Sequence, residues 1–492
     1  MNGSWEAPTL GVLLGHGGRA RIRVWAPSHR NVALRILTPA ERVIPLQSEP
    51  HGYHTAEVDG IEAGATYRVQ LRKNLERADP ASRSQPSGVN GPSSIVDPNS
   101  FPWTDSHWSG LHLDEFVFYE LHIGCFTPEG TFRSAIPELA RLREIGFTAV
   151  EVMPVAEFPG GRNWGYDGVF PFSVQHTYGG PDAFKRFIDA SHRAGLAVVL
   201  DVVYNHVGPE GNHFSDFGPY FSDRYRIPWG QAINFDGPGS DEVRRYFIEN
   251  ALRWFTEFHI DALRLDAVHA IFDGSANPFL AELGDIVHTE AKRMGSRSYF
   301  LIAESDLNDP RLLRDREEGG FGLDAQWADD FHHALHALVT QEGAGYYSDF
   351  GDWRQLSTAF ERPFVYAGEH SPYRERRHGH PPTGLPRERF VVCAQNHDQV
   401  GNRARGDRLS SIVSFERWKA AVGATFLSPY LPLAFMGDEY AEHRPFPFFT
   451  DYSDPDLQQG VLRGRQQEFA EFGWPPEAIP DPQSPRTYEE AH

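Results

Sequence analysis

Three carboxylates in predicted strands are the residues of this sequence best placed to do chemistry. Asp266 lies in the apolar segment 261–268, Glu304 in the segment 298–305, and Asp398 ends the segment 389–398. Glycoside hydrolysis through an oxocarbenium-like transition state requires at least two carboxylates that flank the glycosidic bond. A third negative group can orient ring hydroxyls and favour the developing positive charge. The three positions therefore predict a glycoside-cleaving site if the fold brings them together.

Arg264 accompanies the first of these carboxylates. Arg264 and Asp266 are two positions apart, so on a strand they point to the same side while Leu265 faces the other. A guanidinium beside a carboxylate holds it ionised and oriented, as a nucleophile requires. Taken alone, the pair is equally compatible with a structural salt bridge.

Glu304 and Asp398 have different surroundings. Glu304 follows Leu-Ile-Ala, and burial at the end of so apolar a run would raise its pKa, as a general acid at neutral pH needs. A glutamate that caps the following turn is the alternative for Glu304 alone. Asp398 follows His397 in a Gln-Asn-His-Asp string that, by itself, is typical of an ordinary turn. Three carboxylates at three strand ends, however, are hard to explain as structural coincidence.

Alternating strands and helices must position these groups. We expect strands at 116–124, 148–155, 197–206, 261–268, 298–305, 322–327, 389–398 and 432–440, and helices at 137–146, 182–195, 241–259, 278–295 and 414–428. Strands that are apolar on both faces and separated by helices indicate a parallel sheet covered on both sides. Eight of them predict an α/β fold of the (β/α)8 TIM-barrel class, whose active sites lie at the C-terminal ends of the strands. No GxGxxG or P-loop string opens any of the predicted helices, and this weakens the alternative of a nucleotide-binding fold.

The chain outside the barrel divides into shorter parts. Residues 1–92 contain short runs of period-2 alternation and no helical stripe, which predicts an immunoglobulin-like β-sandwich. A Pro-, Ser- and Gly-rich stretch leads into a linker at 93–112, followed by the catalytic barrel at 113–480 and a tail at 481–492.

Composition narrows the classes of partner. The 492 residues carry a formal net charge of −21, which argues against binding to nucleic acid and to anionic membranes. Two distant cysteines give no disulfide framework or metal spacing, and no leader or membrane-spanning run is evident. We expect a soluble, cytoplasmic protein with a neutral substrate, no cofactor and no metal site.

Four ordered strings resemble the signature regions of the α-amylase superfamily: DVVYNH (201–206), DALRLDAVH (261–269), LIAES (301–305) and QNHD (395–398). The resemblance implies Asp266 as nucleophile, Glu304 as acid/base and Asp398 as transition-state stabiliser in a retaining double displacement. It further implies sugar contacts from a set of residues around them: Tyr166, His206, Arg264, His269, His397 and Gln399.

Longer strings, among them NWGYDGV (163–169), WADDFHHALH (327–336) and QNHDQVGNR (395–403), are similar to those of maltooligosyltrehalose trehalohydrolases. The resemblance implies cleavage of the α-1,4 bond next to a terminal trehalose, with a maltooligosyltrehalose synthase as pathway partner. It places Asp329, Asp330, Phe331, His332 and His333 beside the trehalose end of the substrate. From the residues alone, this string is equally typical of a helix N-terminus with aspartate caps. A branching transglycosylase and a non-catalytic glucan-binding protein on an amylase fold remain the alternatives.

One departure from the resemblance concerns the C-terminus. The family continues past the eighth strand with a last barrel helix and a C-terminal β-domain, whereas this sequence reaches its last residues, 480–492, after what reads as a loop. We therefore expect an unclosed barrel edge with exposed apolar surface.

Overall fold

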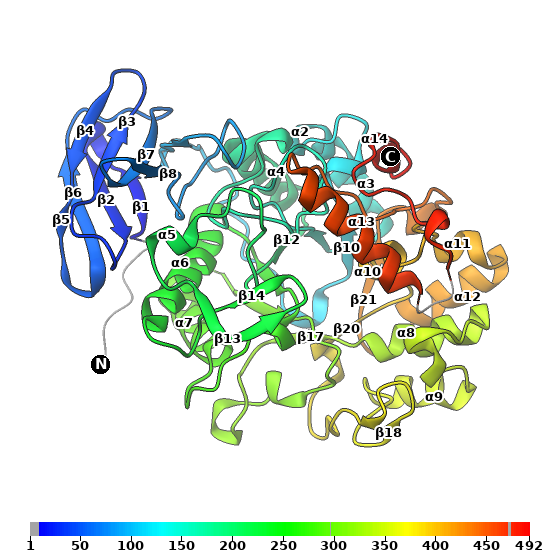
Figure 1. Cartoon of the computed structure of the whole chain (residues 1–492). Helices are drawn as coiled ribbons and strands as arrows, with labels where there is room; N and C mark the ends of the chain where they lie inside the picture. The colour runs from blue at the N-terminus through cyan, green and yellow to red at the C-terminus, as the bar shows by residue number, and fades with distance from the viewer. Residues whose placement is uncertain (1–8, 296, 471–473) are drawn as a thin grey trace.

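The N-terminal part of the chain forms two antiparallel sheets. The computed structural model describes residues 9–295, 297–470 and 474–492 (Figure 1). One sheet has the order β1 (Gly11–Leu14), β2 (Ala20–Trp25), β6 (Tyr53–Val58), β5 (Gln47–Ser48), and the other has β4 (Arg42–Pro45), β3 (Ala33–Ile36), β7 (Thr66–Arg72), β8 (Leu75–Arg77). The short β9 (Ser93–Ser94) also pairs with β7, so strand pairing of this region extends slightly past the expected boundary at residue 92.

Eight parallel strands then close into a barrel, which confirms the predicted TIM-barrel class. In order around the barrel they are β10 (Phe118–Leu121), β11 (Ala149–Val152), β12 (Ala197–Val202), β15 (Ala262–Leu265), β16 (Phe300–Ala303), β17 (Ala325–Trp327), β20 (Phe390–Cys393) and β21 (Leu431–Phe435). Small and branched side chains such as Ala149, Val199 and Ile302 fill the barrel interior. Alternation along each strand sends the next residues outward against the helices.

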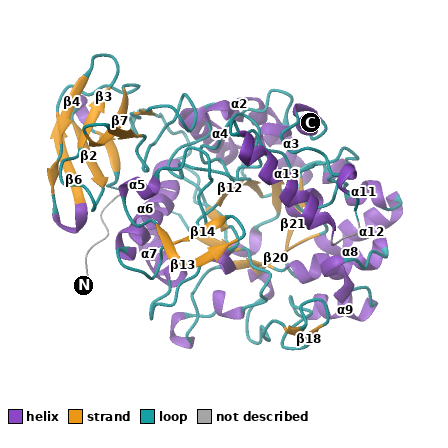
Figure 2. Cartoon of the chain, in the orientation of Figure 1, coloured by secondary structure: helices purple, strands orange, loops and turns teal. Residues whose placement is uncertain are grey.

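Helices cover the outside of the barrel (Figure 2). The principal ones are α3 (Leu139–Ile145), α4 (Gly180–Ala194), α6 (Ser240–Phe258), α7 (Phe279–Met294), α8 (Asp329–Thr340) and α12 (Phe415–Phe426). Five of them coincide with the predicted helices, because their sequences carry apolar residues at helical spacing and several end at a glycine in the left-handed region, such as Gly195 after α4.

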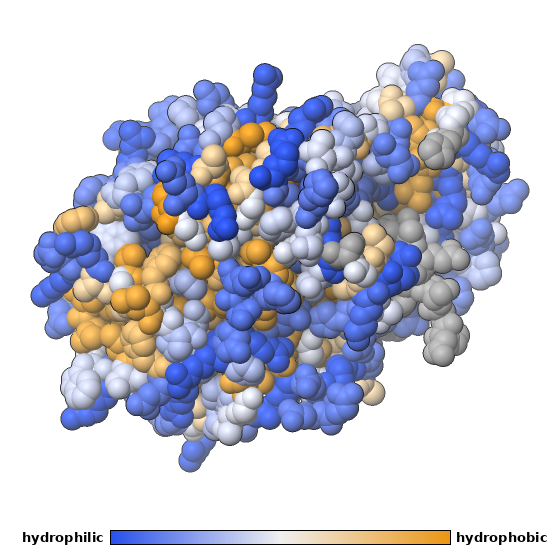
Figure 3. Space-filling view, turned by 180° about the vertical axis from the view of Figure 1, so that it is seen from behind, coloured by the Kyte–Doolittle hydropathy of each residue, from blue (hydrophilic) through white to orange (hydrophobic). Residues whose placement is uncertain are grey.

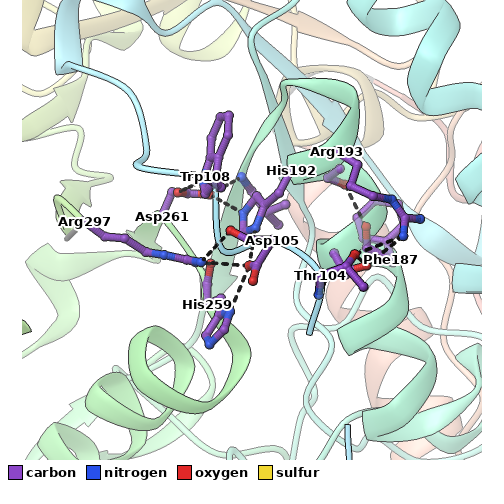
Figure 4. Close-up of polar contacts among 12 residues, drawn as sticks. Thr104, Asp105, Trp108, Phe187, His192, Arg193, His259, Asp261 and Arg297 are labelled. Atoms are coloured by element: carbon purple, nitrogen blue, oxygen red, sulfur yellow. Dashed lines mark hydrogen bonds and ion pairs between the residues drawn. The ribbon is translucent and has the colours of Figure 1, made fainter. Parts of the chain in front are cut away.

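The linker between the sheets and the barrel is held at the N-terminal end of the barrel strands (Figure 4). Asp105 of the linker accepts hydrogen bonds from His192 of α4 at 2.9 Å, His259 at 2.8 Å and Arg297 at 2.8 Å. The other ring nitrogen of His192 lies 3.0 Å from Asp261, at the start of β15. One buried imidazole thus joins a linker carboxylate to a barrel carboxylate.

The N-terminal sheets are also tied directly to α6. The Glu249 carboxylate accepts hydrogen bonds from the backbone amides of Thr9 and Leu10 at 2.6 and 3.0 Å. Tyr53 donates to Glu242 at another position of the same helix. The two parts of the chain are therefore joined by buried polar contacts as well as by the linker.

The expected unclosed barrel edge is wrong. β21 pairs with β10 in parallel register, Phe118 opposite Leu433 and Glu120 opposite Phe435, so strand pairing alone closes the barrel. Helices also follow β21: α13 (Pro455–Ala470) lies across the C-terminal rim, where Arg465 donates to the carbonyl of Gly401, and α14 (Pro485–Glu489) follows.

Apolar surface is nevertheless exposed near the eighth strand. Phe415, Phe426 and Leu427, on or directly after α12, are exposed, Leu427 by 85%. Seen from behind, apolar side chains gather on the side of the molecule where α12 lies (Figure 3). Within the described ranges, no helix is long and apolar enough to cross a membrane.

Candidate active site

A single buried guanidinium organises the open, C-terminal end of the barrel. Arg264 Nη1 donates to Asp201 Oδ2 at 2.6 Å and to Asp266 Oδ1 at 3.0 Å, while its Nη2 lies 3.6 Å from Glu304 Oε2. The Arg264 guanidinium also lies over the ring of Trp327, 4.3 Å from its centre. The predicted Arg264–Asp266 pair is therefore real, and the same cation also reaches Glu304 from the neighbouring strand.

Asp266 is oriented from two sides. Besides Arg264, the side-chain amide of Asn205 donates to Asp266 Oδ2 at 2.8 Å and to the Asp266 backbone carbonyl at 2.8 Å. The side chain of Asp266 keeps 12% exposure, so the carboxylate faces the open end of the barrel. A nucleophile needs this combination of fixed orientation and access to substrate.

Glu304 is held by one backbone amide. Its Oε2 accepts a hydrogen bond from the Ala267 N–H at 2.6 Å. Ala267, which directly follows Asp266, has φ +42°, a strained conformation for a residue with a β-carbon. Burial raises the pKa of Glu304 well above its usual range; Arg264 opposes the rise and nearby carboxylates add to it. A protonated carboxyl at neutral pH suits a general acid.

Asp398 lies in the first turn of α10 (His397–Gly401). Its Oδ1 accepts a hydrogen bond from Asn402 at 2.7 Å, and its charge contributes to the raised pKa of Glu304. The structure thus brings together the three carboxylates that the sequence predicted, at the ends of three different strands.

A hydrogen-bonded chain links His397 to the same centre. Glu120 accepts from the His397 backbone N–H at 2.9 Å and faces its Nδ1 at 2.5 Å. The other ring nitrogen lies 2.7 Å from Tyr166 Oη, which donates to Asp201 at 2.7 Å. Burial alone would lower the pKa of His397, but the Glu120 carboxylate outweighs it and the pKa is raised. The two predicted sugar contacts, Tyr166 and His397, are thus oriented by two carboxylates.

His206 is committed to the protein through both ring nitrogens. Its Nδ1 faces the side-chain oxygen of Asn205 and its Nε2 lies 2.9 Å from the carbonyl of Tyr166. Trp229, between β13 (Phe221–Ile227) and β14 (Gly230–Ile233), stacks on the imidazole with ring centres 5.0 Å apart and is 51% exposed. This tryptophan adds an exposed aromatic face to the rim of the site.

Residues 329–333, at the start of α8, lie in different environments. Asp329 is half-buried and contributes its charge to the raised pKa of Glu304. Burial, reinforced by Asp398, raises the pKa of Asp329 to about 7. Asp330 instead accepts from the backbone amides of Val365 and Tyr366 at 2.8 and 2.9 Å. Asp329 faces the carboxyl groups of Glu304 and Asp398, whereas Asp330 organises a neighbouring loop.

The remaining residues of the string are buried. Phe331 is fully buried and packs against Phe360 and Tyr430, so its side chain serves the core and does not reach the site. His332 is bonded to the Ala394 carbonyl at 2.7 Å. Phe331 and His332 were expected beside the trehalose end of the substrate, but both side chains lie in the core, because periodic helix packing turns these positions inward.

His333, by contrast, retains a buried ring nitrogen, Nδ1, with no hydrogen-bond partner. Burial lowers the pKa of His333 to about 3. His269 is exposed and lines a pocket of about 170 Å3 with Leu307 and Arg311. Gln399 is half-buried near Asp398, with its backbone N–H bonded to the side chain of Asn396 at 2.9 Å.

Several site residues were given no catalytic or binding role in the sequence analysis. Asn205 and Asp201 lie in the DVVYNH string, and Glu120 is an acidic residue inside an apolar strand, which was the available signal for a buried polar role. Trp229 lies on a hairpin and gave no signal. Among the described residues, no group of three or more His, Cys, Asp or Glu side chains is arranged to hold a metal ion.

Comparisons with known proteins agree with this geometry. The family described as alpha amylase, catalytic domain, matches residues 94–226. A solved structure of a putative alpha amylase from Salmonella typhimurium has 42% sequence identity and a TM-score of 0.91, covering 99% of this chain and 82% of that one. A pullulanase from Bacillus subtilis, at 17% identity and a TM-score of 0.68, shows the fold alone.

Curated relatives give a narrower family. A malto-oligosyltrehalose trehalohydrolase from Saccharolobus solfataricus is 48% identical over 460 residues, covering 94% of this chain and 80% of the relative. Another from Arthrobacter ramosus is 47% identical over 475 residues, covering 96% and 82%. A 1,4-alpha-glucan branching enzyme from Corynebacterium jeikeium is 30% identical over 426 residues and is covered over only 55% of its length. The chain belongs to the malto-oligosyltrehalose trehalohydrolase family of the α-amylase superfamily.

Proposed function

We propose that this protein hydrolyses the α-1,4-glucosidic bond next to the terminal trehalose of a maltooligosyltrehalose, releasing trehalose and a maltooligosaccharide. The observation that carries the proposal is the contact of one guanidinium, Arg264, with both Asp266 and Glu304 at the open end of the barrel. The names of the relatives at 40–48% identity supply the substrate.

In the first step Asp266 is the nucleophile. One of its oxygens forms a bond to the anomeric carbon of the glucosyl unit as the bond from that carbon to the glycosidic oxygen breaks. Glu304 gives its proton to the departing oxygen, so trehalose leaves as a neutral molecule. The products of this step are a glycosyl–Asp266 ester and an ionised Glu304.

In the second step Glu304 acts as a base. Its carboxylate takes a proton from water, the water oxygen bonds to the anomeric carbon, and the ester bond to Asp266 breaks. One water is consumed, both carboxyl groups return to their starting states, and the anomeric configuration is retained. Asp398 favours the positive charge that develops on the ring in both steps.

The neighbouring residues hold the sugars. Tyr166 and His397 contact the glucosyl unit that becomes attached to Asp266. Hydrogen bonds from His397 to Glu120 and from Tyr166 to Asp201 hold these two side chains in place. Asp329 and His333 border the trehalose end. The half-buried Asp329 carboxyl faces the cleft and offers a hydrogen bond that a plain maltodextrin end would leave incompletely paired.

The proposal also includes a cellular context. A synthase that converts the reducing end of a glucan into a trehalose unit supplies this substrate, and we place both reactions in the cytoplasm. Both cysteines, Cys125 and Cys393, are free and buried, as a reducing compartment permits.

The test is to incubate the protein with maltotriosyltrehalose and, separately, with maltopentaose. Release of trehalose from the first with little cleavage of the second is the expected result. Asp266→Ala should abolish the release, whereas Asp285→Ala, a change on the exposed surface of α7, should not. Similar cleavage of both substrates would indicate a general amylase, and branched products would indicate a transglycosylase. Inactivity toward both substrates in a folded sample would refute the proposal.

A further inference from the structure

A second carboxyl layer lies inside the barrel, beneath the catalytic residues. Glu120, Glu151 and Asp201 come from three consecutive strands, β10, β11 and β12, and all three are buried to within 2% exposure. Glu120 is the register partner of Glu151, so both side chains point to the same side of the sheet. Alternation places this side inward, since Ala149, two residues before Glu151, belongs to the cluster that fills the barrel.

These three carboxyl groups differ in their hydrogen bonds. Glu120 accepts from His397 through both oxygens. Asp201 accepts from Tyr166 and Arg264 at the same oxygen, Oδ2, while its Oδ1 is buried without a partner. Glu151 has no hydrogen-bond partner at either carboxyl oxygen. In this layer, therefore, neither oxygen of Glu151 receives a hydrogen bond, and Oδ1 of Asp201 receives none either.

The surroundings of Glu151 determine whether its carboxyl group is protonated or ionised. A buried ionised carboxylate without donors is strongly disfavoured. Burial raises the pKa of Glu151 well above its usual range; Glu120 and Asp201 reinforce the rise, and Arg264 opposes it. Cys393 of β20 is the further titratable group facing it. The absence of donors at both buried oxygens therefore favours the neutral carboxylic acid, with an O–H group that needs an acceptor.

We propose that Glu151 is a positioning residue that donates its proton, directly or through a buried water, to Oδ1 of Asp201 and so fixes the Asp201–Arg264 pair under the nucleophile. Asp201 holds Arg264 at 2.6 Å, and Arg264 holds Asp266 at 3.0 Å. Loss of the Glu151 donor would leave Asp201 Oδ1 bare and favour protonation of Asp201. A protonated Asp201 would no longer hold Arg264 in place.

Two substitutions separate the donor from the bulk of the side chain. Glu151→Gln keeps the shape, the neutrality and a donor, whereas Glu151→Met keeps the approximate volume and removes the donor. Burial raises the pKa of Asp201 to about 6 in the intact protein. We expect Glu151→Gln to retain kcat within about threefold with an unchanged pH profile. Glu151→Met should lower kcat by about tenfold to a hundredfold, the effect of one lost hydrogen bond to a charged group, and should move the acid limb to higher pH.

The kinetic part rests on the proposed function, because it follows trehalose release from maltotriosyltrehalose. A direct measurement does not: the infrared C=O stretch of a protonated carboxyl, recorded near neutral pH for the intact protein minus Glu151→Gln. A positive difference band is expected. No difference band overturns the proposal, as does a Glu151→Met protein with an unaltered pH profile, or a Glu151→Gln protein that loses more than tenfold in kcat. If the unmodified protein releases no trehalose, the proposed function fails, and the infrared band still decides the state of Glu151.

Discussion

The side-chain amide of Asn205 makes two hydrogen bonds of 2.8 Å to one residue, Asp266: one to the carboxylate and one to the backbone carbonyl. The pair of bonds ties the end of β12 to the end of β15 and fixes the carboxylate relative to its own backbone. Arg264 binds the other oxygen of Asp266, so each oxygen has a separate donor. Rotation of the Asp266 side chain is therefore restricted before substrate binds.

Asn205→Ala should lower kcat for trehalose release by about tenfold to a hundredfold, because hydrogen bonds to charged groups contribute about 1.5–3 kcal/mol and each 1.36 kcal/mol corresponds to a factor of ten. KM should change little, since Asn205 orients the nucleophile and does not hold the sugar. Steady-state kinetics with maltotriosyltrehalose measure both parameters. Asn99→Ala, at an exposed linker position, is the matched control. An unchanged kcat in Asn205→Ala would show that Arg264 alone orients Asp266.

Asp329 and Asp330 are adjacent carboxyls that should behave differently when neutralised. The Asp329 charge contributes to the raised pKa of Glu304, so Asp329→Asn should lower that pKa. Because the general acid must be protonated, activity falls as the pH rises through the pKa of Glu304. The alkaline limb of the kcat/KM profile should therefore move to lower pH in Asp329→Asn.

Asp330→Asn provides the matched comparison. Asp330 accepts two backbone hydrogen bonds and one from Asn308 at the same oxygen, and the amide oxygen of asparagine can accept all three, so Asp330→Asn should change the melting temperature and the alkaline limb little. Thermal unfolding and pH–rate profiles of both variants measure the two effects. Equal shifts of the alkaline limb in the two variants would contradict the assignment of Asp329 to the catalytic carboxylates.

Much of the barrel could be predicted from sequence because its strands and helices carry strong local patterns. The strand containing Leu265 and the strand ending at Glu304 are apolar runs between helices with clear stripes, and the strand-end rule of parallel barrels then collects their polar residues. Closure between β10 and β21 follows only from the barrel class and from no local pattern, since it pairs strands some three hundred residues apart. A long-range pairing leaves no signal in a local window.

The separate roles of residues 329–333 could not be predicted from the sequence either. Asp329 and Asp330 have the same chemistry, and only the direction of the first turn of α8 decides that one faces Glu304 and the other faces Val365. Trp229 was missed for a similar reason. Its position on a hairpin between β13 and β14 is fixed by tertiary contacts, including the stack on His206.

Trp229→Ala should raise KM for maltotriosyltrehalose by about tenfold with a smaller effect on kcat, because aromatic side chains at an exposed rim supply apolar contact area for one face of a pyranose, and about 1.4 kcal/mol corresponds to a factor of ten. The ring is 51% exposed and held flat against His206. Trp353→Ala, at an exposed tryptophan of α9 (Trp353–Glu361), is the control and should leave both constants unchanged. A selective loss of kcat in Trp229→Ala would instead indicate that Trp229 acts by supporting His206.

His192 should make the stability of the fold depend on pH. Its two ring nitrogens lie 2.9 Å from Asp105 and 3.0 Å from Asp261, and both contacts are hydrogen bonds only when the ring carries both protons. Burial alone would lower the pKa of His192, but the two carboxylates outweigh it, and the pKa is raised above the usual value. Protonated His192 therefore contributes stability that is complete below about pH 6.5, the unfolded-state value, and is lost as the pH rises through the raised folded-state pKa.

His192→Gln should accordingly destabilise the protein most at mildly acidic pH, by about 3 kcal/mol, the lower end of the cost of breaking a buried ion pair. The difference from the unmodified protein should shrink as the pH increases toward 9, because the unmodified protein then loses the same charge. Denaturant unfolding at a series of pH values measures this difference. His107→Gln, at an exposed histidine of the same linker, is the control for loss of an imidazole. A destabilisation in His192→Gln that stays constant from pH 6 to 9 would mean that His192 stabilises the linker by packing against Trp108 and not by its charge.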